Sequence, residues 1–139
     1  MNPSYVPTLS KLDVSRLEKS VLGADRRRVE RDAALLALEE RLDTGLVVAA
    51  SEVAPDVVTM NSRVTLEASD GRRHTVTLVY PSSADAISGR VSVLAPLGHA
   101  LLGARVGEVA RFEVPGWPPR ELRIIGIDYQ PESAGDFDL

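Results

Sequence analysis

Apolar residues in the first third of the chain recur every three or four positions, which is the spacing of one face of a helix. They are Val14, Leu17 and Val21, then Val29, Ala33 and Leu36, with Leu35, Leu38 and Leu42 on a neighbouring stripe. Asp13 and Asp25 are the expected N-caps, and Gly23 and Gly45 are the expected stops. The pattern predicts a short helix, a tight turn at residues 23–25 and a second helix of about 20 residues, roughly 30 Å long. Together they form an antiparallel, coiled-coil-like hairpin over residues 1–45.

After residue 53 the chain is rich in Gly, Pro, Val and Thr, and runs of β-branched residues replace the helical spacing. Strands are predicted over residues 57–68, 72–80, 108–115 and 121–129. Asp70 and Gly71 match a two-residue hairpin turn between the first two. The stretch 96–103 is the one helical pattern in this half. Residues 46–139 are therefore predicted to form a bent antiparallel sheet with one short helix, which makes the chain an α+β protein.

Composition narrows the classes of function. The chain has 139 residues, with 16 Lys and Arg against 20 Asp and Glu, so its net charge is −4. A negative net charge does not suit a protein that binds nucleic acid over its whole surface. The sequence has no Cys, which excludes disulfides, thiol catalysis and zinc held by Cys. No stretch has the pattern of a signal peptide or a membrane span. We expect a cytoplasmic protein without a membrane partner.

Candidate catalytic chemistry is sparse. His74 and His99 are the only histidines, and neither has an acid or a second histidine at a ligand spacing. The serines lack the context of an activated nucleophile, and no glycine-rich loop joins a strand to a helix. We therefore predict no catalytic residue, metal, cofactor or small-molecule substrate, and a protein that is not an enzyme.

Several separated motifs carry a family resemblance. The stretch LAPLGHALLGARVGEVARFEVPG (residues 94–116), followed by RELRIIGIDYQP (residues 120–131), resembles the C-terminal domain of the bacterial Gre transcript-cleavage factors. The motifs DVVTMNSRV, LVYP and YQPESAGDFDL are similar to the narrower family called regulator of nucleoside diphosphate kinase. The resemblance implies an FKBP-like fold, a shortened helical hairpin and RNA polymerase as partner.

The same resemblance implies which residues contact the polymerase. Pro96 starts the short helix, and Leu101 and Leu102 anchor it on the sheet. We expect the entry to this helix, Ala95, Pro96 and Leu97, to be exposed. By the resemblance, it corresponds to the loop that faces a helical rim beside the polymerase secondary channel. Trp117, in a loop rich in prolines, is a further candidate for partner contact.

The hairpin tip determines the expected mechanism. Gre factors place acidic residues from this tip beside the polymerase magnesium, where carboxylate oxygens help to position a metal and its water. Here Asp25 is the one carboxylate at the turn, its N-cap role explains it, and Arg26, Arg27 and Arg28 follow it. We expect binding without stimulated cleavage, in competition with Gre factors. The arginines form a solvated surface, or contact an acidic polymerase surface or nucleic acid held by polymerase.

Two alternatives remain. A true cleavage factor needs more acids at the tip than this sequence offers. A prolyl isomerase, which the FKBP-like fold also hosts, needs a pocket lined with aromatic rings, and the chain has six scattered aromatics. They are Tyr5, Tyr80, Phe112, Trp117, Tyr129 and Phe137. The family name implies an influence on nucleoside diphosphate kinase or nucleotide pools, which we interpret as indirect.

Overall fold

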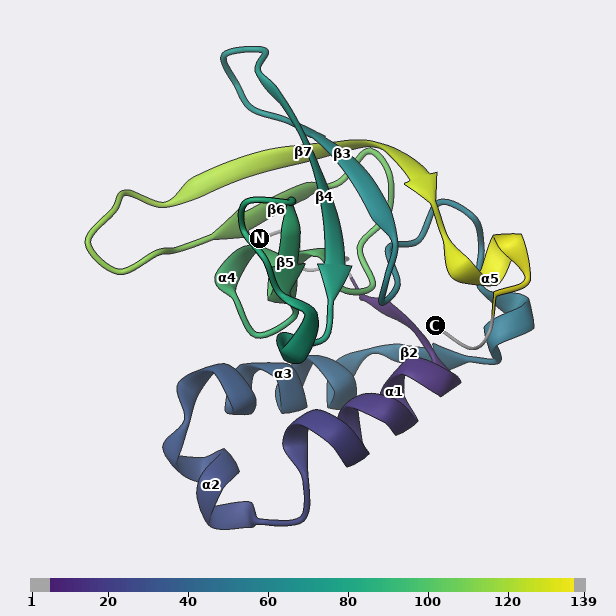
Figure 1. Cartoon of the computed structure of the whole chain (residues 1–139), viewed down its shortest axis with the longest axis vertical. Coiled ribbons are helices and arrows are strands. Elements are labelled where there is room, and N and C mark those ends of the chain that lie inside the picture. The colour runs from purple at the N-terminus through teal and green to yellow at the C-terminus, as the bar shows by residue number, and fades with distance from the viewer. Residues whose placement is uncertain (1–5, 137–139) are drawn as a thin grey trace.

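The computed structural model describes residues 6–136, which form an α+β structure with a strongly curved sheet above a layer of helices (Figure 1). The helices are α1 (Lys11–Leu17), α2 (Arg26–Arg31), α3 (Ala33–Thr44), α4 (Pro96–Leu101) and α5 (Pro131–Ala134). The strands are β1 (Thr8–Ser10), β2 (Leu46–Val48), β3 (Arg63–Glu67), β4 (Arg73–Val79), β5 (Arg90–Ser92), β6 (Val109–Phe112) and β7 (Arg120–Tyr129). A π-helical turn, Glu18–Leu22, continues α1, and 3-10 turns occupy Ala50–Glu52 and Pro81–Ser83.

The larger sheet has the strand order β5-β4-β3-β7-β6. Strand β3 is antiparallel to β4 and β7, and β6 is antiparallel to β7, as the sequence pattern predicts. The prediction of a wholly antiparallel sheet is wrong, because β5 pairs with β4 in parallel and β1 pairs with β2 in parallel. Strand β1 is three residues long and pairs with a strand 38 positions later in register, Thr8 with Leu46, so local pattern does not reveal it.

The β3–β4 turn differs slightly from the prediction. The Ala68 N–H donates to the Arg72 carbonyl over 2.8 Å, which leaves residues 69–71 as a three-residue loop and not a two-residue turn. Gly71 has a φ of 86°, the left-handed conformation that such a loop requires at its last position. The position of the turn was predicted correctly, and its length was not.

The predicted N-cap of α1 is wrong. Ser10 caps the helix, with its hydroxyl accepting from the Asp13 N–H over 3.4 Å. Asp13 lies in the first turn, is 3% exposed, and accepts the Met60 N–H over 3.0 Å. The Ser10 to Asp13 spacing is that of a capping box, a signal that was present in the sequence.

The predicted long second helix is also wrong, because Asp32 interrupts it. Its backbone is extended (φ −114°, ψ 112°), and its carboxylate accepts the N–H groups of Ala34 and Leu35 over 2.9 and 3.2 Å. The helix is therefore split into α2 and α3. Asp is a strong N-cap because its oxygen satisfies donors that a helix start leaves unpaired.

One hydrophobic core joins the helices to the sheet. Leu17 and Leu38 from the helices, and Leu66 and Ile124 from the sheet, are each at most 1% exposed and belong to the same cluster. The helical layer is thus fixed to the sheet by burial of apolar surface. The coiled-coil and FKBP-like descriptions, and a boundary at residues 45 and 46, stay predictions. Within residues 6–136, none of the helices combines the length and the apolar character that a membrane crossing needs.

Buried Asp13 makes stability depend on pH. Burial, and secondarily the charge of Glu132, raise its pKa from 3.8 to about 7. Between these values the folded chain binds more protons than the unfolded chain, so this group lowers stability as pH rises, by at most about 1.4 kcal/mol per pH unit. Asp13→Asn keeps an acceptor for Met60 and should remove this slope, as measured by urea unfolding from pH 4 to 8. The matched control is Asp70→Asn at the exposed turn; equal slopes for both variants would contradict the account.

Helix α4 lies so close to β5 that Gly98 has no room for a side chain. A Cβ there would stand 1.9 Å from the Ser92 carbonyl oxygen. Gly98→Ala should therefore lower the free energy of unfolding by about 1–3 kcal/mol, although Ala is the better helix former. Gly126→Ala is the control, because nothing lies within 4 Å of its Cβ position. Urea titration of the two variants checks this, and an unchanged midpoint for Gly98→Ala would show that α4 moves freely from β5.

Candidate functional site

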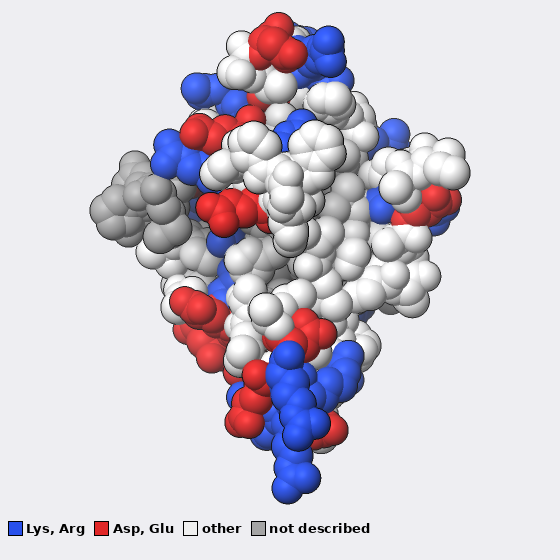
Figure 2. Space-filling model, turned by 90° about the vertical axis from the view of Figure 1, so that its left-hand side faces the viewer, with Lys and Arg blue, Asp and Glu red and all other residues white. Residues whose placement is uncertain are grey.

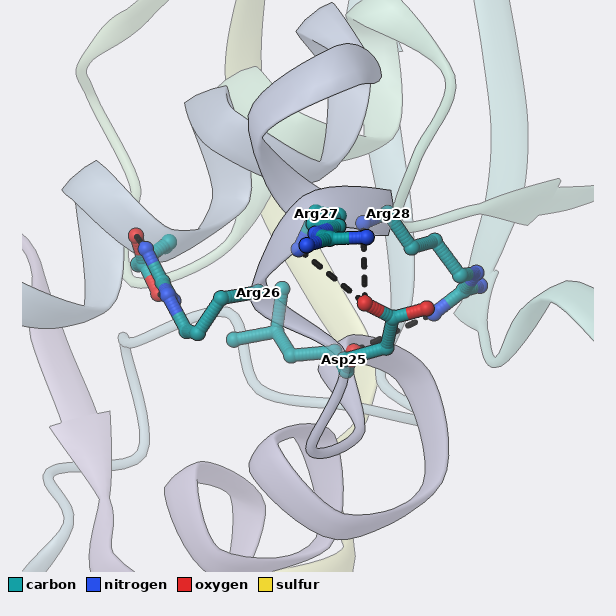
Figure 3. Close-up of polar contacts among 6 residues, drawn as sticks. Asp25, Arg26, Arg27 and Arg28 are labelled. Carbon is teal, nitrogen blue, oxygen red and sulfur yellow. Dashed lines mark hydrogen bonds and ion pairs between the residues drawn. The ribbon is translucent and has the colours of Figure 1, made fainter.

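Asp25, at the tip of the helical layer, has a structural role as a helix cap. Its carboxylate accepts the N–H groups of Arg27 and Arg28 over 3.0 and 3.4 Å, so it is the N-cap of α2, as predicted (Figure 3). The preceding Gly23 has a φ of 70° and ends the π-helical turn. The one carboxylate of the turn thus satisfies the backbone of its own helix.

The side chains of the three tip arginines differ in the contacts that they make. Arg26 forms a two-contact ion pair with Glu39 of α3, which raises the pKa of the guanidinium and lowers that of the carboxyl. Arg28 turns back and donates Nη1–H groups to the carbonyls of Val21 and Leu22 over 2.9 and 3.1 Å. This places a cation at the C-terminal end of the π-helical turn, where the peptide dipoles favour it. Figure 3 shows Arg26 and Arg28 extending to opposite sides of Asp25.

Arg27 is the member of the triplet left for an external contact. Its side chain is exposed and forms no ion pair within residues 6–136; the same holds for Arg31 at the end of α2. Basic side chains gather at the lower end of the face in Figure 2, which corresponds to α2 in Figure 1. The predicted basic tip is therefore present, but two of its three arginines are already engaged within the chain.

The predicted docking residues lie at the start of α4, and they differ in exposure. Pro96 is exposed at the first helical position, while Ala95 and Leu97 are half-buried. Leu97 packs against the hydrophobic core. The expectation that all three are exposed is thus wrong for Ala95 and Leu97, and the Leu97 side chain also supports the fold. Leu101 and Leu102 are buried, as expected of the scaffold.

Trp117 stands in the loop between β6 and β7, and 71% of its surface is exposed. The backbone N–H of Trp117 donates to the Val114 carbonyl over 3.0 Å, and the preceding Gly116 has a φ of 83°. Pro119 from the same loop lines a hollow together with Pro96 and Phe112. The structure therefore brings the base of the Trp117 loop to the start of α4, which joins two segments that the sequence predicted separately.

Two side chains, Arg41 and His99, connect α3 with the end of α4, and no sequence pattern predicted either of them. Arg41 donates Nε–H to the Leu102 carbonyl over 2.7 Å and Nη2–H to the Ala100 carbonyl over 3.3 Å. His99 Nε2 lies 3.0 Å from the Ala37 carbonyl. Burial, followed by the charge of Arg41, lowers the pKa of His99, so the ring is neutral at pH 7 and donates Nε2–H to Ala37. These contacts fix the tip-bearing helices relative to α4.

Within residues 6–136, neither histidine lies in a group of potential metal ligands. His74 is exposed on β4, and His99 is committed to α3. Among the residues that the structure describes, no three His, Asp or Glu side chains are grouped so that they could hold a metal ion. Of the aromatic residues considered for an isomerase pocket, Tyr5 and Phe137 lie outside the described residues. Among the described residues, Phe112 is the one aromatic side chain that lines the two hollows beside α4.

Comparison with known proteins places these features in a family. The model for the C-terminal part of the transcription elongation factors GreA and GreB matches residues 52–129. The regulator of nucleoside diphosphate kinase from Escherichia coli (strain K12) is 44% identical over 104 residues, which cover 74% of this chain and 76% of that protein. Transcription elongation factor GreA from Clostridium perfringens (strain SM101 / Type A) is 26% identical over 136 residues, covering 88% of this chain and 85% of that protein.

A solved structure, the prokaryotic transcription elongation factor GreA/GreB from Nitrosomonas europaea, superposes with a TM-score of 0.69 at 33% sequence identity. The match covers 90% of this chain and 99% of that one, so it includes helices as well as sheet. The matched region of the family model contains α4, β6, β7 and the Trp117 loop. The chain belongs to the GreA/GreB family, and within it to the Gre-related group that includes the regulator of nucleoside diphosphate kinase.

Proposed function

We propose that this Gre-related regulator binds RNA polymerase at the secondary channel, through the start of α4 and the Trp117 loop, and does so without stimulating transcript cleavage. An occupied site excludes Gre factors, so the protein acts on elongation by competition. It is not itself an enzyme, and any influence on nucleoside diphosphate kinase or nucleotide pools is indirect. The cytoplasm is where such a protein works.

The observation that carries the proposal is the use of Asp25. Metal recruitment at a tip needs carboxylate oxygens that face outward. The carboxylate of Asp25 accepts two backbone N–H groups of α2, and Arg26, Arg27 and Arg28 surround it with positive charge. A divalent cation would meet repulsion there, because guanidinium groups remain protonated at any physiological pH.

The docking surface is supported by chemistry suited to a protein partner. Exposed Trp117 and Pro96 offer apolar area, and Arg120 places its guanidinium 5.8 Å from the Phe112 ring centre beside them. Aromatic and arginine side chains at the centre of a contact contribute most of the binding energy in many protein interfaces. The part of the chain that the structure describes contributes one aromatic residue, Phe112, to this hollow, which does not suit the aromatic wall of a prolyl isomerase.

Competition is the first expected result. Adding this protein to stalled elongation complexes that contain a Gre factor should suppress Gre-stimulated transcript shortening in proportion to its concentration. The half-inhibitory concentration should rise as more Gre factor is added, because the two proteins share one site. An inhibition that does not change with the Gre concentration would place this protein at another site. No inhibition and no binding at micromolar protein would overturn the proposal.

Docking should depend on Pro96 and Trp117. Pro96→Glu leaves α4 intact, since an acidic residue is favourable in the first turn of a helix. It should weaken polymerase binding at least tenfold, as should Trp117→Ala, on the order of 1.4 kcal/mol each. Leu97 is left unchanged because it packs on the core. Ile87→Glu, at a position that is fully exposed in another loop, is the control for surface charge. Equal affinities for all three variants would show that another surface docks.

The free tip arginines should make binding depend on salt. Replacing Arg27 and Arg31 with Gln leaves the Arg26 and Arg28 contacts in place, so α2 should remain folded. The variant should show a smaller loss of polymerase affinity between about 50 and 200 mM salt than the parent protein. Arg72→Gln in the β3–β4 turn is the control. If both variants keep the parent salt dependence, the tip does not touch polymerase or its nucleic acid.

A further inference from the structure

Within residues 6–136, one edge of β6 pairs with no other strand, and this edge borders a groove that the proposed docking surface does not use in full. Strand β6 is the last strand of the sheet, paired with β7 on one side. Four consecutive residues, 108–111, line a hollow together with Arg41 and His99. Successive side chains of a strand point to opposite faces, so consecutive residues line one hollow only when the hollow runs along the backbone edge.

A second hollow continues the first along the same strand. Residues 111–113 line it, with Pro96 and Pro119 on its other sides, and His99 and Arg111 border both hollows. We call the two together the edge groove. It follows the strand from Glu108 to Glu113, a length of about 17–20 Å for six extended residues.

The two halves of the edge groove differ in charge. Arg41 and Arg111 line the first hollow against one acidic residue, Glu108, and His99 there is neutral. Glu108 already accepts the Arg105 N–H over 2.6 Å. Among the described residues Arg41 donates to two backbone carbonyls and forms no ion pair; burial lowers the pKa of its guanidinium, and the charge of Glu108 offsets this in part. A partly buried cation without a paired anion favours an acidic ligand group. The second hollow is lined by Pro96, Phe112 and Pro119, together with His99 and one residue of each charge, Arg111 and Glu113, so it lacks the excess of positive charge of the first.

We infer that the edge groove binds an extended peptide segment of a partner protein, which adds a strand to β6. The peptide carries an acidic side chain toward Arg41 and Arg111 and, two residues along, an apolar side chain toward the second hollow. Residues two apart on a strand lie on the same face, about 6.5–7 Å from one another, which suits two adjoining hollows. The backbone of β6 supplies hydrogen bonds and the two hollows supply selectivity, as in other cases of strand addition.

The test is an NMR titration of the full chain, without polymerase, so that its outcome is separate from that of the proposed function. The probe is the peptide Ac-TVEVLT-NH2, with Glu and Leu two positions apart. We expect saturable shifts of the amides of residues 108–113, with a dissociation constant below about 1 mM. The peptide with Gln in place of Glu should bind at least about tenfold more weakly, and a peptide methylated on alternate backbone nitrogens should not shift these amides.

Arg111→Gln tests the acidic contact without disturbing the fold, because Arg111 is exposed and its ion pair with Glu121 is loose at 3.5 Å. Its affinity for the Glu peptide should fall at least about tenfold, while its affinity for the Gln peptide stays unchanged. Arg72→Gln is the control and should bind as the parent does.

Four results would overturn the inference. The first two are unchanged amide shifts of residues 108–113 up to several millimolar peptide, and equal affinities for the Glu and Gln peptides. The third is amide shifts at residues 108–113 that change with protein concentration in the absence of peptide, and the fourth is peptide binding only to a chain shortened to begin at Val6. The third would assign the β6 edge to a second copy of this chain, and the fourth to a segment of the chain itself.

Discussion

The hydrogen bonds from Arg41 to the carbonyls of Ala100 and Leu102 determine how the basic tip is placed relative to α4. Arg41 belongs to α3, which follows the basic tip, and the two carbonyls belong to the end of α4, whose first residue is the proposed docking contact. Carbonyls at a helix end lack partners within the helix, so a cation placed there stabilises both the helix and the junction. His99 adds a second link to α3. A partner that holds α4 therefore also sets where the tip is placed.

On the proposed function, the tip is what distinguishes this chain from a cleavage factor. A helix that starts at the end of a short turn needs an N-cap, and Asp25 meets that need. The charge around it is then set by Arg26, Arg27 and Arg28, of which two are used to hold α2 against α3 and against the π-helical turn. The same few residues thus build the tip: both N–H contacts of Asp25 fall on one oxygen, Oδ1, and the arginine triplet makes its surroundings positive. On the proposed function, this positive charge suits occupation of the polymerase channel better than recruitment of a metal ion.

The parts of the fold and site that could be predicted from the sequence depend on neighbours in the chain. The Asp25 cap, the start of α4 at Pro96 and the position of the turn at Asp70 and Gly71 all follow from residues within a few positions of each other. The family was also recognisable, because its motifs are contiguous.

Most of the wrong predictions concern residues whose structure depends on a contact with a residue far away in the sequence. Asp13 has the local signature of a cap, but Met60, 47 positions later, gives its carboxylate a partner in the core. The parallel β1–β2 pair and the Arg41 contacts join residues dozens of positions apart. Leu97 was expected at the surface, and the core it packs against is assembled from the whole chain. The break at Asp32 is different: its capping signal was local, but the continuous apolar spacing on both sides of it favoured a single helix.

The measurement that tests the central claim most directly is the rate of transcript shortening in stalled elongation complexes saturated with this protein alone, as a function of magnesium concentration. We predict the rate of factor-free complexes at every magnesium concentration, because the one carboxylate of the turn caps α2 and stands among three arginines. A rate that rises above the factor-free value and grows with magnesium would mean that the tip recruits metal after all, and the account would be contradicted.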